Sequence, residues 1–459
     1  MIMIKKILYV FITSILTLSC SQGFLDIKPA KNLVILSTIE DFEALLDRVA
    51  IFNEKGSQSL ALISSDDYFL TKSSWETIVT PFQRNVYIWD KEIFEGTQSA
   101  DWDNGYERIF YSNIAIEGLN KIVPSENDQK KWNDVMARAL FHRAWNHFNI
   151  LVLFGEYGSE SQDLSNKIGI PLRKESDITI PVTRENVKAA YDFIIEDLNN
   201  AQTLFDDSKY NIERPSKQSV LALLARVYLY FQDYEKAFHN ADLCLKMNAE
   251  LIDYNELDAS RSYPFPAYGL NNKEILFNSW QPSISALAQS RLCIDTNLLV
   301  TYSNDDLRLG MFFRDNGLGN KTFKGSYVGN LFMFSGISLN EVYVIGMEAA
   351  ARIDKLDVAL SLYNNLRIKR INKLSYVPQY EVSKDQLMEL ILKEKRKEMV
   401  LRSNRWEDLK RFNNTSGAKM ILTRKLDNQI YTLPPFDNRY TMPIPEYVIK
   451  FSGVQQNIR

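Results

Sequence analysis

The residues that could support acid–base catalysis are few, and their spacing is poor for it. The chain of 459 residues contains three histidines, and His142 and His147 lie five positions apart in one predicted helix. That spacing places them about 140° apart around the helix axis, so they do not share a metal-binding face. We interpret both as packing residues. The sequence contains no HExxH, CxxC, GxSxG or GxxxxGK motif.

A dense group of charges near the C-terminus resembles an acid–base site at first sight. It comprises Glu394, Arg396, Glu398, Arg405 and Asp408. Glu394 and Glu398 are four residues apart on one helix face, amid positive neighbours that would lower their pKa. A general acid needs a raised pKa. We therefore interpret the group as a structural ion network.

Loop acids occur in three pairs that could offer oxygen ligands to calcium. These are Asp66-Asp67, Asp101 with Asp103, and Asp305-Asp306. None continues into an EF-hand loop with its glycine and terminal glutamate. We interpret them as solvated loop acids or acceptors for sugar hydroxyls, and we predict no metal and no cofactor.

Aromatic residues make up 12% of the chain, which leaves rings available for a binding surface. A sugar needs an exposed ring to stack on and polar side chains to satisfy its hydroxyls. Two loop regions offer this mixture, and Trp75 and Trp280 are favoured because their polar neighbours argue against deep burial. The predicted ligand-binding residues are Asp67, Tyr68, Trp75, Tyr263, Tyr268, Trp280, Gln281 and Arg291.

The N-terminus predicts export. Lys5 and Lys6 precede the apolar residues 7–18, a stretch shorter than the ~20 residues that span a bilayer. Cys20 follows where a bacterial lipoprotein signal places its acylated cysteine, so residues 1–19 are a predicted signal peptide and Cys20 the predicted lipidation site. The alternative is an ordinary cleaved signal with a chance cysteine. With a net charge of −3 the chain has no basic surplus to neutralise a phosphate backbone, so we predict no nucleic-acid partner.

Apolar residues at helical spacing dominate the rest of the chain. Helices are predicted at 39–49, 102–122, 129–154, 184–204, 217–230, 233–247, 340–352, 355–369 and 384–402. Small residues and tyrosines recur at tetratricopeptide spacing, for example Ala225, Tyr228 and Ala237. We predict one domain, 20–459, with a helical scaffold at about 102–250 and 339–411. Loop-rich regions are expected at about 53–100 and 250–339. Cys244 is expected to be a buried free thiol.

Six segments, in chain order, resemble the motifs of SusD/RagB-type outer-membrane lipoproteins. They are Cys20…Phe24-Leu25-Asp26…Pro29, residues 137–155, residues 222–229, Glu341-Val342-Tyr343…Glu348-Ala349, residues 394–411 and residues 442–457. The chain departs from the family pattern at Leu140, Met399, Arg402 and Ser403. These matches span the predicted mature chain.

The resemblance implies a mainly α fold in which tetratricopeptide-like helix pairs form a scaffold and a long loop-rich lobe carries the ligand site. It further implies a non-catalytic, lipid-anchored protein of the outer membrane, facing the exterior, that captures oligosaccharides for a SusC-like TonB-dependent transporter. Peptide or amino-acid capture by the same architecture is an alternative, and a protein-recruiting tetratricopeptide scaffold is another. A glycosidase would need paired carboxylates roughly 5–10 Å apart.

Overall fold

The computed structural model describes residues 36–207, 211–415 and 420–459. Two compact units divide the chain, Met1–Thr38 and Ile39–Arg459, and the fold described below is that of the second unit. The predicted signal peptide, Cys20 and the Phe24-Leu25-Asp26 motif lie outside the described residues. None of the helices in the described ranges is long and apolar enough to cross a lipid bilayer.

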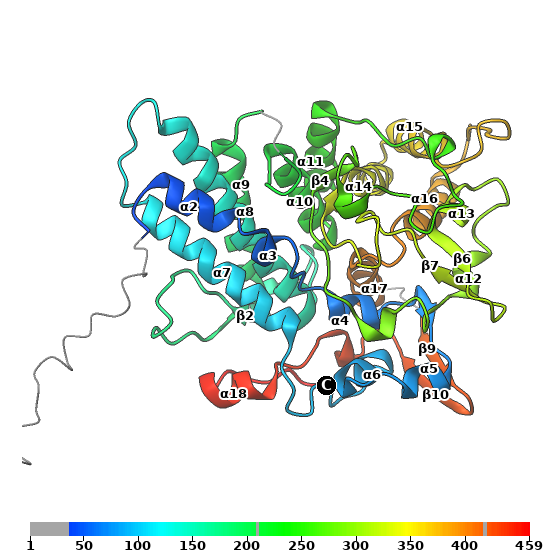
Figure 1. The fold of residues 1–459 in the computed structure, drawn as a ribbon, viewed down its shortest axis with the longest axis horizontal. Helices are drawn as coiled ribbons and strands as arrows, with labels where there is room; N and C mark the ends of the chain where they lie inside the picture. The colour runs from blue at the N-terminus through cyan, green and yellow to red at the C-terminus, as the bar shows by residue number, and fades with distance from the viewer. Residues whose placement is uncertain (1–35, 208–210, 416–419) are drawn as a thin grey trace, which may run out of the picture. The chain divides into compact units, whose positions relative to one another are not determined.

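Helices are the main elements, as the sequence predicts, and every segment predicted to be helical contains one (Figure 1). Serine caps fix two of the helix starts, because Ser216 and Ser383 each form a capping box with the residue three positions on. The longer helices are α2 (Ile39–Leu46), α7 (Ala100–Leu119), α8 (Gln129–Phe154), α9 (Val187–Leu204), α10 (Lys217–Tyr230), α11 (Tyr234–Met247), α14 (Leu339–Arg352), α15 (Leu356–Arg367), α16 (Lys384–Glu398) and α17 (Asn404–Asn413).

The start of helix α9 differs from the prediction. Residues Arg184–Asn186 form strand β3, which pairs antiparallel with β2 (Ile168–Pro171). The helix therefore begins after Asn186, whose side chain accepts the capping hydrogen bond from a backbone N–H of the first turn, at 2.8 Å. Thr183, which directly precedes the predicted helix 184–204, lies before the strand.

Consecutive helices pack against each other, α7 with α8, α8 with α9, α10 with α11 and α14 with α15. Ala237 and Ala359 are fully buried in these pairs. A Cβ at Gly346 of α14 would lie 3.2 Å from the Leu362 side chain and 3.5 Å from that of Ala241. Helices α11, α14 and α15 approach this closely because the position is small. The predicted scaffold of helix pairs is confirmed.

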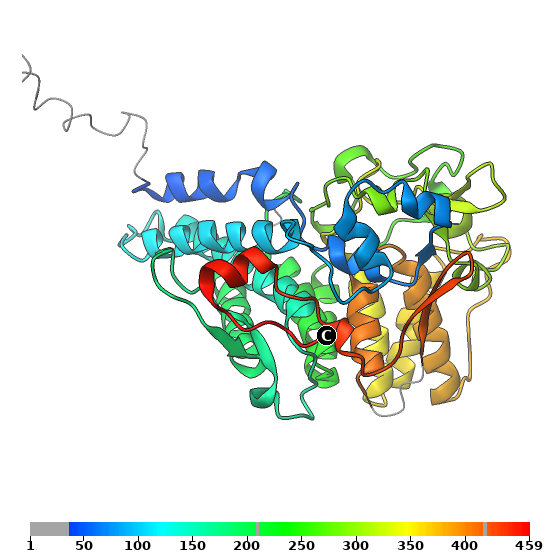
Figure 2. The same ribbon diagram turned by 90° about the horizontal axis from the view of Figure 1, so that it is seen from below.

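The two loop-rich segments meet each other. Strand β1 (Tyr68–Phe69) of the first pairs antiparallel with β5 (Cys293–Ile294) of the second. Figure 2 shows the two segments, blue and light green, on one side of helices α14 and α16. Their other short elements are α3 (Val49–Phe52), α4 (Ser59–Ser64), α5 (Lys72–Glu76), α6 (Pro81–Tyr87), β4 (Ile275–Phe277) paired with β8 (Ile337–Ser338), α12 (Thr296–Leu299), α13 (Arg308–Phe312), and β6 (Phe313–Asp315) paired with β7 (Lys321–Phe323).

A C-terminal hairpin was not predicted. Strands β9 (Leu422–Leu426) and β10 (Gln429–Leu433) pair antiparallel along their whole length. Strand β9 alternates buried and exposed residues, but one of its buried residues is Arg424, which lies over the rings of Tyr68 and Tyr87. A buried arginine breaks the apolar alternation from which a strand is predicted. Helix α18 (Glu446–Ser452), which buries none of its residues, was also missed.

Buried ion pairs connect the loop-rich lobe to the helices. Arg308 of α13 has no exposed surface and pairs with Glu394 at 2.6 Å and Glu398 at 2.8 Å, both on α16. Arg370, equally buried, pairs with Glu398 at 2.9 Å and with Glu274, beside β4, at 2.8 Å. The predicted ion network is therefore confirmed, and it holds two loop segments against one helix.

A second buried network joins three helices. Glu348 of α14 pairs with Lys395 of α16 at 3.0 Å and with Arg411 of α17 at 2.6 Å. Burial alone would raise the pKa of Glu348, but Arg411 and Lys395 lower it to about 2. Burial likewise opposes the charge of Glu394, whose pKa Arg308 and Lys397 lower to about 2. Both carboxyl groups stay ionised at neutral pH, which is the opposite of what a general acid requires.

We expect Arg308→Met to destabilise the protein by about 3–5 kcal/mol, because it leaves Glu394 and Glu398 buried with one counter-charge fewer. Lys393→Met is the matched control. Lys393 also belongs to an ion pair of α16, with Glu389 at 2.6 Å, but both side chains are more than half exposed, so the loss should stay below about 1 kcal/mol. Urea denaturation followed by circular dichroism measures the free energy of unfolding of both variants. Equal stability of the two variants would contradict the role given to the buried network.

Candidate ligand-binding site

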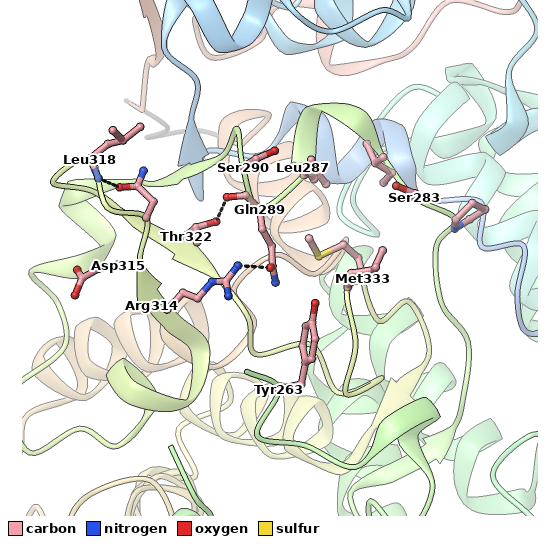
Figure 3. A pocket seen from close by; sticks show the side chains of 15 residues that line it. Tyr263, Ser283, Leu287, Gln289, Ser290, Arg314, Asp315, Leu318, Thr322 and Met333 are labelled. Atoms are coloured by element: carbon pink, nitrogen blue, oxygen red, sulfur yellow. Dashed lines mark hydrogen bonds between the residues drawn. The ribbon is translucent and has the colours of Figure 1, made fainter. Parts of the chain in front are cut away.

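An open pocket with a volume of about 540 Å³ lies in the loop-rich lobe (Figure 3). Its walls come from a loop that carries Tyr263, from residues 282–290, from the β6–β7 hairpin and from residues 331–333. The lining residues are Tyr263, Pro282, Ser283, Ile284, Leu287, Ala288, Gln289, Ser290, Arg314, Asp315, Asn316, Leu318, Thr322, Leu331 and Met333.

The β6–β7 hairpin forms one wall. Arg314 lies opposite Thr322 in the strand register, and Phe313 lies opposite Phe323. Side chains alternate across a strand, so the two buried phenylalanines point into the core while Arg314 and Thr322 lie on the other face. The turn has Gly317 and Gly319 at φ +77° and +80°, and the Asn316 side chain accepts hydrogen bonds from two of its backbone N–H groups.

Two hydrogen bonds join this hairpin to the 282–290 loop. The Thr322 hydroxyl donates to the Gln289 backbone carbonyl at 2.9 Å, and the Arg314 guanidinium donates to the Gln289 side-chain oxygen at 2.7 Å. Thr322 is almost fully buried, so its bond is shielded from water. The pocket therefore has two walls that are held together before any ligand arrives.

The pocket is lined by both apolar and polar side chains. Leu287 and Met333 are buried in its wall, and Tyr263 presents a half-buried ring. Gln289, Arg314 and the two serines of the loop supply hydrogen-bonding groups. This arrangement suits a ligand with one apolar face and a hydroxylated edge. Among the lining residues in the described ranges, Asp315 is the sole carboxylate, so the pocket lacks the carboxylate pair that glycoside hydrolysis uses.

Of the residues predicted from the sequence, Tyr263 lines this pocket and the other seven do not. Asp67 and Tyr68 are buried in the core. The Tyr68 hydroxyl donates to the Ile63 carbonyl at 3.0 Å. The Asp67 carboxylate accepts from the Leu401 N–H at 2.9 Å. Leu401 has φ +54° and lies beyond the end of helix α16, which was predicted to extend past it. The expectation that these two side chains face solvent is wrong.

Burial also overturns the expected exposure of Trp280 and Gln281, which are 6% and 1% exposed. Their polar neighbours are buried as well, because backbone carbonyls satisfy them. The Asn278 side chain donates to the Tyr268 carbonyl at 2.8 Å, and the Ser279 hydroxyl donates to the Asn53 carbonyl at 3.0 Å. Tyr268 is 54% exposed, with its ring centroid 6.1 Å from that of Trp280.

Trp75 and Arg291 come from the two different loop regions and lie at the same short helix. Trp75 of α5 is half-buried, and its indole N–H donates to the Arg84 carbonyl at 3.1 Å. Arg291 donates to the hydroxyl of Thr77, the C-cap of α5, at 3.1 Å. The predicted roles of Trp75, Tyr268 and Arg291 in ligand binding stay predictions.

Gln289, Arg314 and Met333 are pocket residues that the sequence reasoning missed. One pattern could have indicated them. A Gly-Leu-Gly turn at 317–319 lies between Phe312-Phe313 and Thr322-Phe323, a pattern that is typical of a hairpin. Finding that hairpin would have placed Arg314 on its polar face. Nothing local in the sequence indicates that the hairpin meets the 282–290 loop.

The loop acids that could have suggested calcium have other partners. Asp66 forms a bidentate pair with Arg405, at 2.6 and 2.7 Å, and Asp101 accepts from the Leu60 N–H at 2.6 Å. Burial, followed by the neighbouring Asp66 carboxylate, raises the pKa of Asp67 to about 6. Within the described ranges, no group of three or more potential metal ligands occurs.

The two helical histidines pack in the core, as predicted. The His142 ring lies 4.4 Å from that of Phe52, and His147 makes a hydrogen bond with the Arg143 carbonyl at 2.9 Å. Burial and the charge of Arg143 lower the pKa of His147 to about 3. Cys244 is a buried free thiol, also as predicted.

A second, smaller hollow of about 270 Å³ lies where helix α7, residues 171–182 and helix α18 meet. Trp102, Tyr106 and Phe110 of α7 form one side of it. The Tyr106 hydroxyl donates to the Pro171 carbonyl at 2.8 Å, and the Trp102 ring packs edge-on against Phe154. The rings of Trp102 and Tyr106 are therefore engaged in contacts within the protein.

Comparison with known sequences identifies the family. Residues 23–229 match the family profile described as "Starch-binding associating with outer membrane", and residues 337–457 match the profile described as "SusD family". The chain belongs to the SusD family. A curated relative, SusD-like protein P2 of Formosa agariphila, is 32% identical over 154 residues, which is 34% of this chain. The match spans only 28% of the length of that relative.

Solved SusD-family structures have the same fold. A SusD superfamily protein of Bacteroides thetaiotaomicron aligns with a TM-score of 0.73 at 20% identity, covering 92% of this chain and 100% of its own. A putative sugar-binding protein of Bacteroides vulgatus aligns with a TM-score of 0.73 at 20% identity, covering 92% of this chain and 98% of its own. Surface glycan-binding protein A of Bacteroides fluxus aligns with a TM-score of 0.67 at 17% identity, covering 92% of this chain and 99% of its own. The predicted family and fold class are confirmed.

The pocket of this SusD-family chain lies outside both matched stretches. Its lining residues fall between 263 and 333, whereas the matches end at 229 and resume at 337. The matched stretches hold most of the scaffold helices and the carboxylates of helix α16, whereas Arg308 and Glu274 of the buried ion pairs lie between them. Family membership therefore accounts for the scaffold, and the chemistry of the pocket has to be read from the residues of this chain.

We expect the folded protein to lose stability as the pH falls from about 6.5 towards 3, partly because of His147. The unfolded chain protonates this histidine near pH 6.5, whereas the folded chain resists protonation until about pH 3. His147→Gln should flatten that part of the melting-temperature curve measured by calorimetry. His239→Gln, at an exposed position, is the control and should leave the slope unchanged. Identical slopes in both variants would contradict the assignment.

Proposed function

We propose that this SusD-family chain binds oligosaccharides at the outer membrane and delivers them to a SusC-like TonB-dependent transporter, without catalysing a reaction. The observation that carries the proposal is the open pocket in the loop-rich lobe, which is lined by a tyrosine ring, by apolar side chains and by hydrogen-bonding groups. The family description as starch-binding and outer-membrane-associating supports it. So do two structural relatives described as sugar-binding and glycan-binding.

The pocket matches the surface of a sugar ring. The half-buried ring of Tyr263 offers a face for the C–H groups of the sugar, and Leu287 and Met333 extend the apolar area. Gln289 keeps its amide nitrogen available, because its oxygen already accepts from Arg314. A sugar hydroxyl can accept from that nitrogen and donate to a serine of the loop. The volume of about 540 Å³ falls in the range of small-ligand sites.

A binding role without chemistry agrees with the contents of the site. Asp315 pairs with Lys321 at 2.9 Å and is exposed, and no second carboxylate is present among the lining residues in the described ranges to act with it. His142 and His147 are buried in the scaffold helix α8 and have no access to the pocket. Hydrolysis of an oligosaccharide that binds to the purified protein would contradict this part of the proposal.

The lipid anchor and the transporter partner rest on the sequence. The predicted signal peptide ends before Cys20, and acylation there would hold the folded unit at the membrane surface. Its exterior-facing orientation follows from the resemblance to SusD/RagB-type proteins. Delivery to a transporter follows from the resemblance to SusD/RagB-type proteins. Peptides are the alternative cargo that the same architecture could capture.

We expect Tyr263→Ala to weaken oligosaccharide binding at least about tenfold, because the sugar loses its stacking surface. Isothermal titration calorimetry of residues 21–459 against a panel of neutral and charged oligosaccharides and short peptides measures the effect. Tyr380→Ala, at a 72% exposed tyrosine before helix α16, is the matched control and should bind as the wild type does. Loss of binding in Tyr268→Ala but not in Tyr263→Ala would place the site at the Tyr268–Trp280 pair instead. Binding of peptides alone would favour the alternative cargo.

We expect Cys20→Ser to release the protein from the membrane, since the thiol that would carry the lipid is gone. Fractionation of the producing cells, followed by immunoblotting, measures this. Cys244→Ser, at the buried thiol of helix α11, is the control and should stay in the membrane fraction. Membrane association of both variants would contradict lipidation at Cys20.

A further inference from the structure

Arg314 stands out among the pocket residues because its charge is not neutralised. It is exposed on strand β6, and its guanidinium donates to the neutral Gln289 side chain at 2.7 Å. In the part of the chain that the structure describes, no carboxylate forms an ion pair with it. The adjacent Asp315 projects to the other face of the strand and pairs with Lys321 at 2.9 Å. Figure 3 shows the Arg314 side chain directed towards Gln289 and Asp315 directed away from it.

The surroundings add positive charge. Lys324, one residue beyond strand β7, is 6% exposed, and its ammonium group donates to the carbonyls of Ala259 and Arg261 at 2.7 and 3.0 Å. Burial lowers the pKa of Lys324, and the positive charge of Arg314 lowers it further. The two cations are therefore near enough to interact, and both contribute positive potential at the pocket. The nearby acid Asp258 is engaged by Ser260, through its N–H at 2.9 Å and its hydroxyl at 2.6 Å.

The orientation of Arg314 is fixed before a ligand binds. Its bond to Gln289 holds the guanidinium at the pocket, and the buried Thr322 bond fixes the backbone of Gln289 itself. An arginine that is already oriented loses less side-chain entropy on binding. Its planar group then offers its remaining N–H donors in the geometry that matches the oxygens of a carboxylate or a sulfate.

We propose that the pocket selects an anionic oligosaccharide, in which Arg314 binds a carboxylate or a sulfate ester while Tyr263 stacks on the sugar ring. This inference rests on the proposed oligosaccharide-binding function and adds the chemical class of the ligand. Arg314 is then the residue that determines specificity. A neutral sugar leaves its charge without a partner, whereas an acidic sugar pairs with it.

The test compares ligands that differ only in charge. Tetragalacturonate and its fully methyl-esterified form share one backbone, and a sulfated and an unsulfated carrageenan-type tetrasaccharide form a second pair. Isothermal titration calorimetry on residues 21–459 measures the affinity for each ligand. The wild type should bind the charged member of at least one pair about tenfold to hundredfold more tightly, as expected for hydrogen bonds to a charged group. The responding pair distinguishes a carboxylate ligand from a sulfate ligand.

Variants then assign the preference to one residue. Arg314→Gln should abolish the difference between the charged and neutral members, and Arg314→Lys should retain part of it, since the charge remains but the planar donor set is lost. Lys425→Gln removes one exposed cation from strand β9 of the other hairpin and should bind as the wild type does. Far-ultraviolet circular dichroism confirms that each variant is folded.

The outcomes separate the two claims. Binding of neutral and charged members with equal affinity, lost in Tyr263→Ala, would overturn the inference about anionic ligands and leave oligosaccharide binding standing. A preference for charge that persists in Arg314→Gln would overturn the role of Arg314. Absence of binding to every sugar on the panel, with binding to acidic peptides instead, would overturn the proposed function as well.

Discussion

The buried ion pairs of Arg308 and Arg370 are the interaction on which the arrangement of this protein depends. Each arginine has no exposed surface, and each joins the loop-rich lobe to the carboxylates of helix α16. Removing such charges from water is costly, and only close, multiple contacts offset that cost. Glu398 accepts from both arginines and from Asn340 at 2.9 Å, so one side chain orients three segments. The pairing therefore allows few alternative placements of the lobe.

The pocket depends on this attachment. Arg308 lies on α13, directly before strand β6, so the network fixes the start of the hairpin that carries Arg314. Glu274 accepts from the Tyr327 hydroxyl at 2.6 Å, which ties the loop after β7 to the same network. The 282–290 loop is then held by the hairpin. In this account a rigid ionic interior supports a pocket whose walls are mostly irregular backbone, and such walls can vary without changing the scaffold.

The helices were predictable because their information is local. Apolar spacing located α10 and α16 within a few residues, and the structure shows a serine capping box at the start of each. Positive neighbours close in sequence also indicated that Glu394 and Glu398 belong to an ion network, but their partners Arg308 and Arg370 lie far away in the chain. Strand β9 was not predicted because of a long-range contact. Its Arg424 is buried among aromatic rings from distant segments, and a charged residue at a buried position breaks the apolar alternation of the strand.

The site was less predictable because its walls come from segments far apart in the chain. Tyr263, Gln289, Arg314 and Met333 meet only in the folded lobe. The polar neighbours of Trp280 suggested exposure, but backbone carbonyls of distant residues satisfy them inside the protein. Composition therefore located the lobe that carries the pocket and identified Tyr263, whereas the hairpin and its arginine required the structure.

Hydrogen–deuterium exchange with mass spectrometry, on residues 21–459 with and without a saturating oligosaccharide, tests the central claim that the ligand binds between the hairpin and the 282–290 loop. We expect slower exchange at residues 282–290 and 313–323 when the sugar is bound, with the scaffold helices unchanged. Protection confined to residues 100–110 and 446–454, around the smaller hollow, would contradict it.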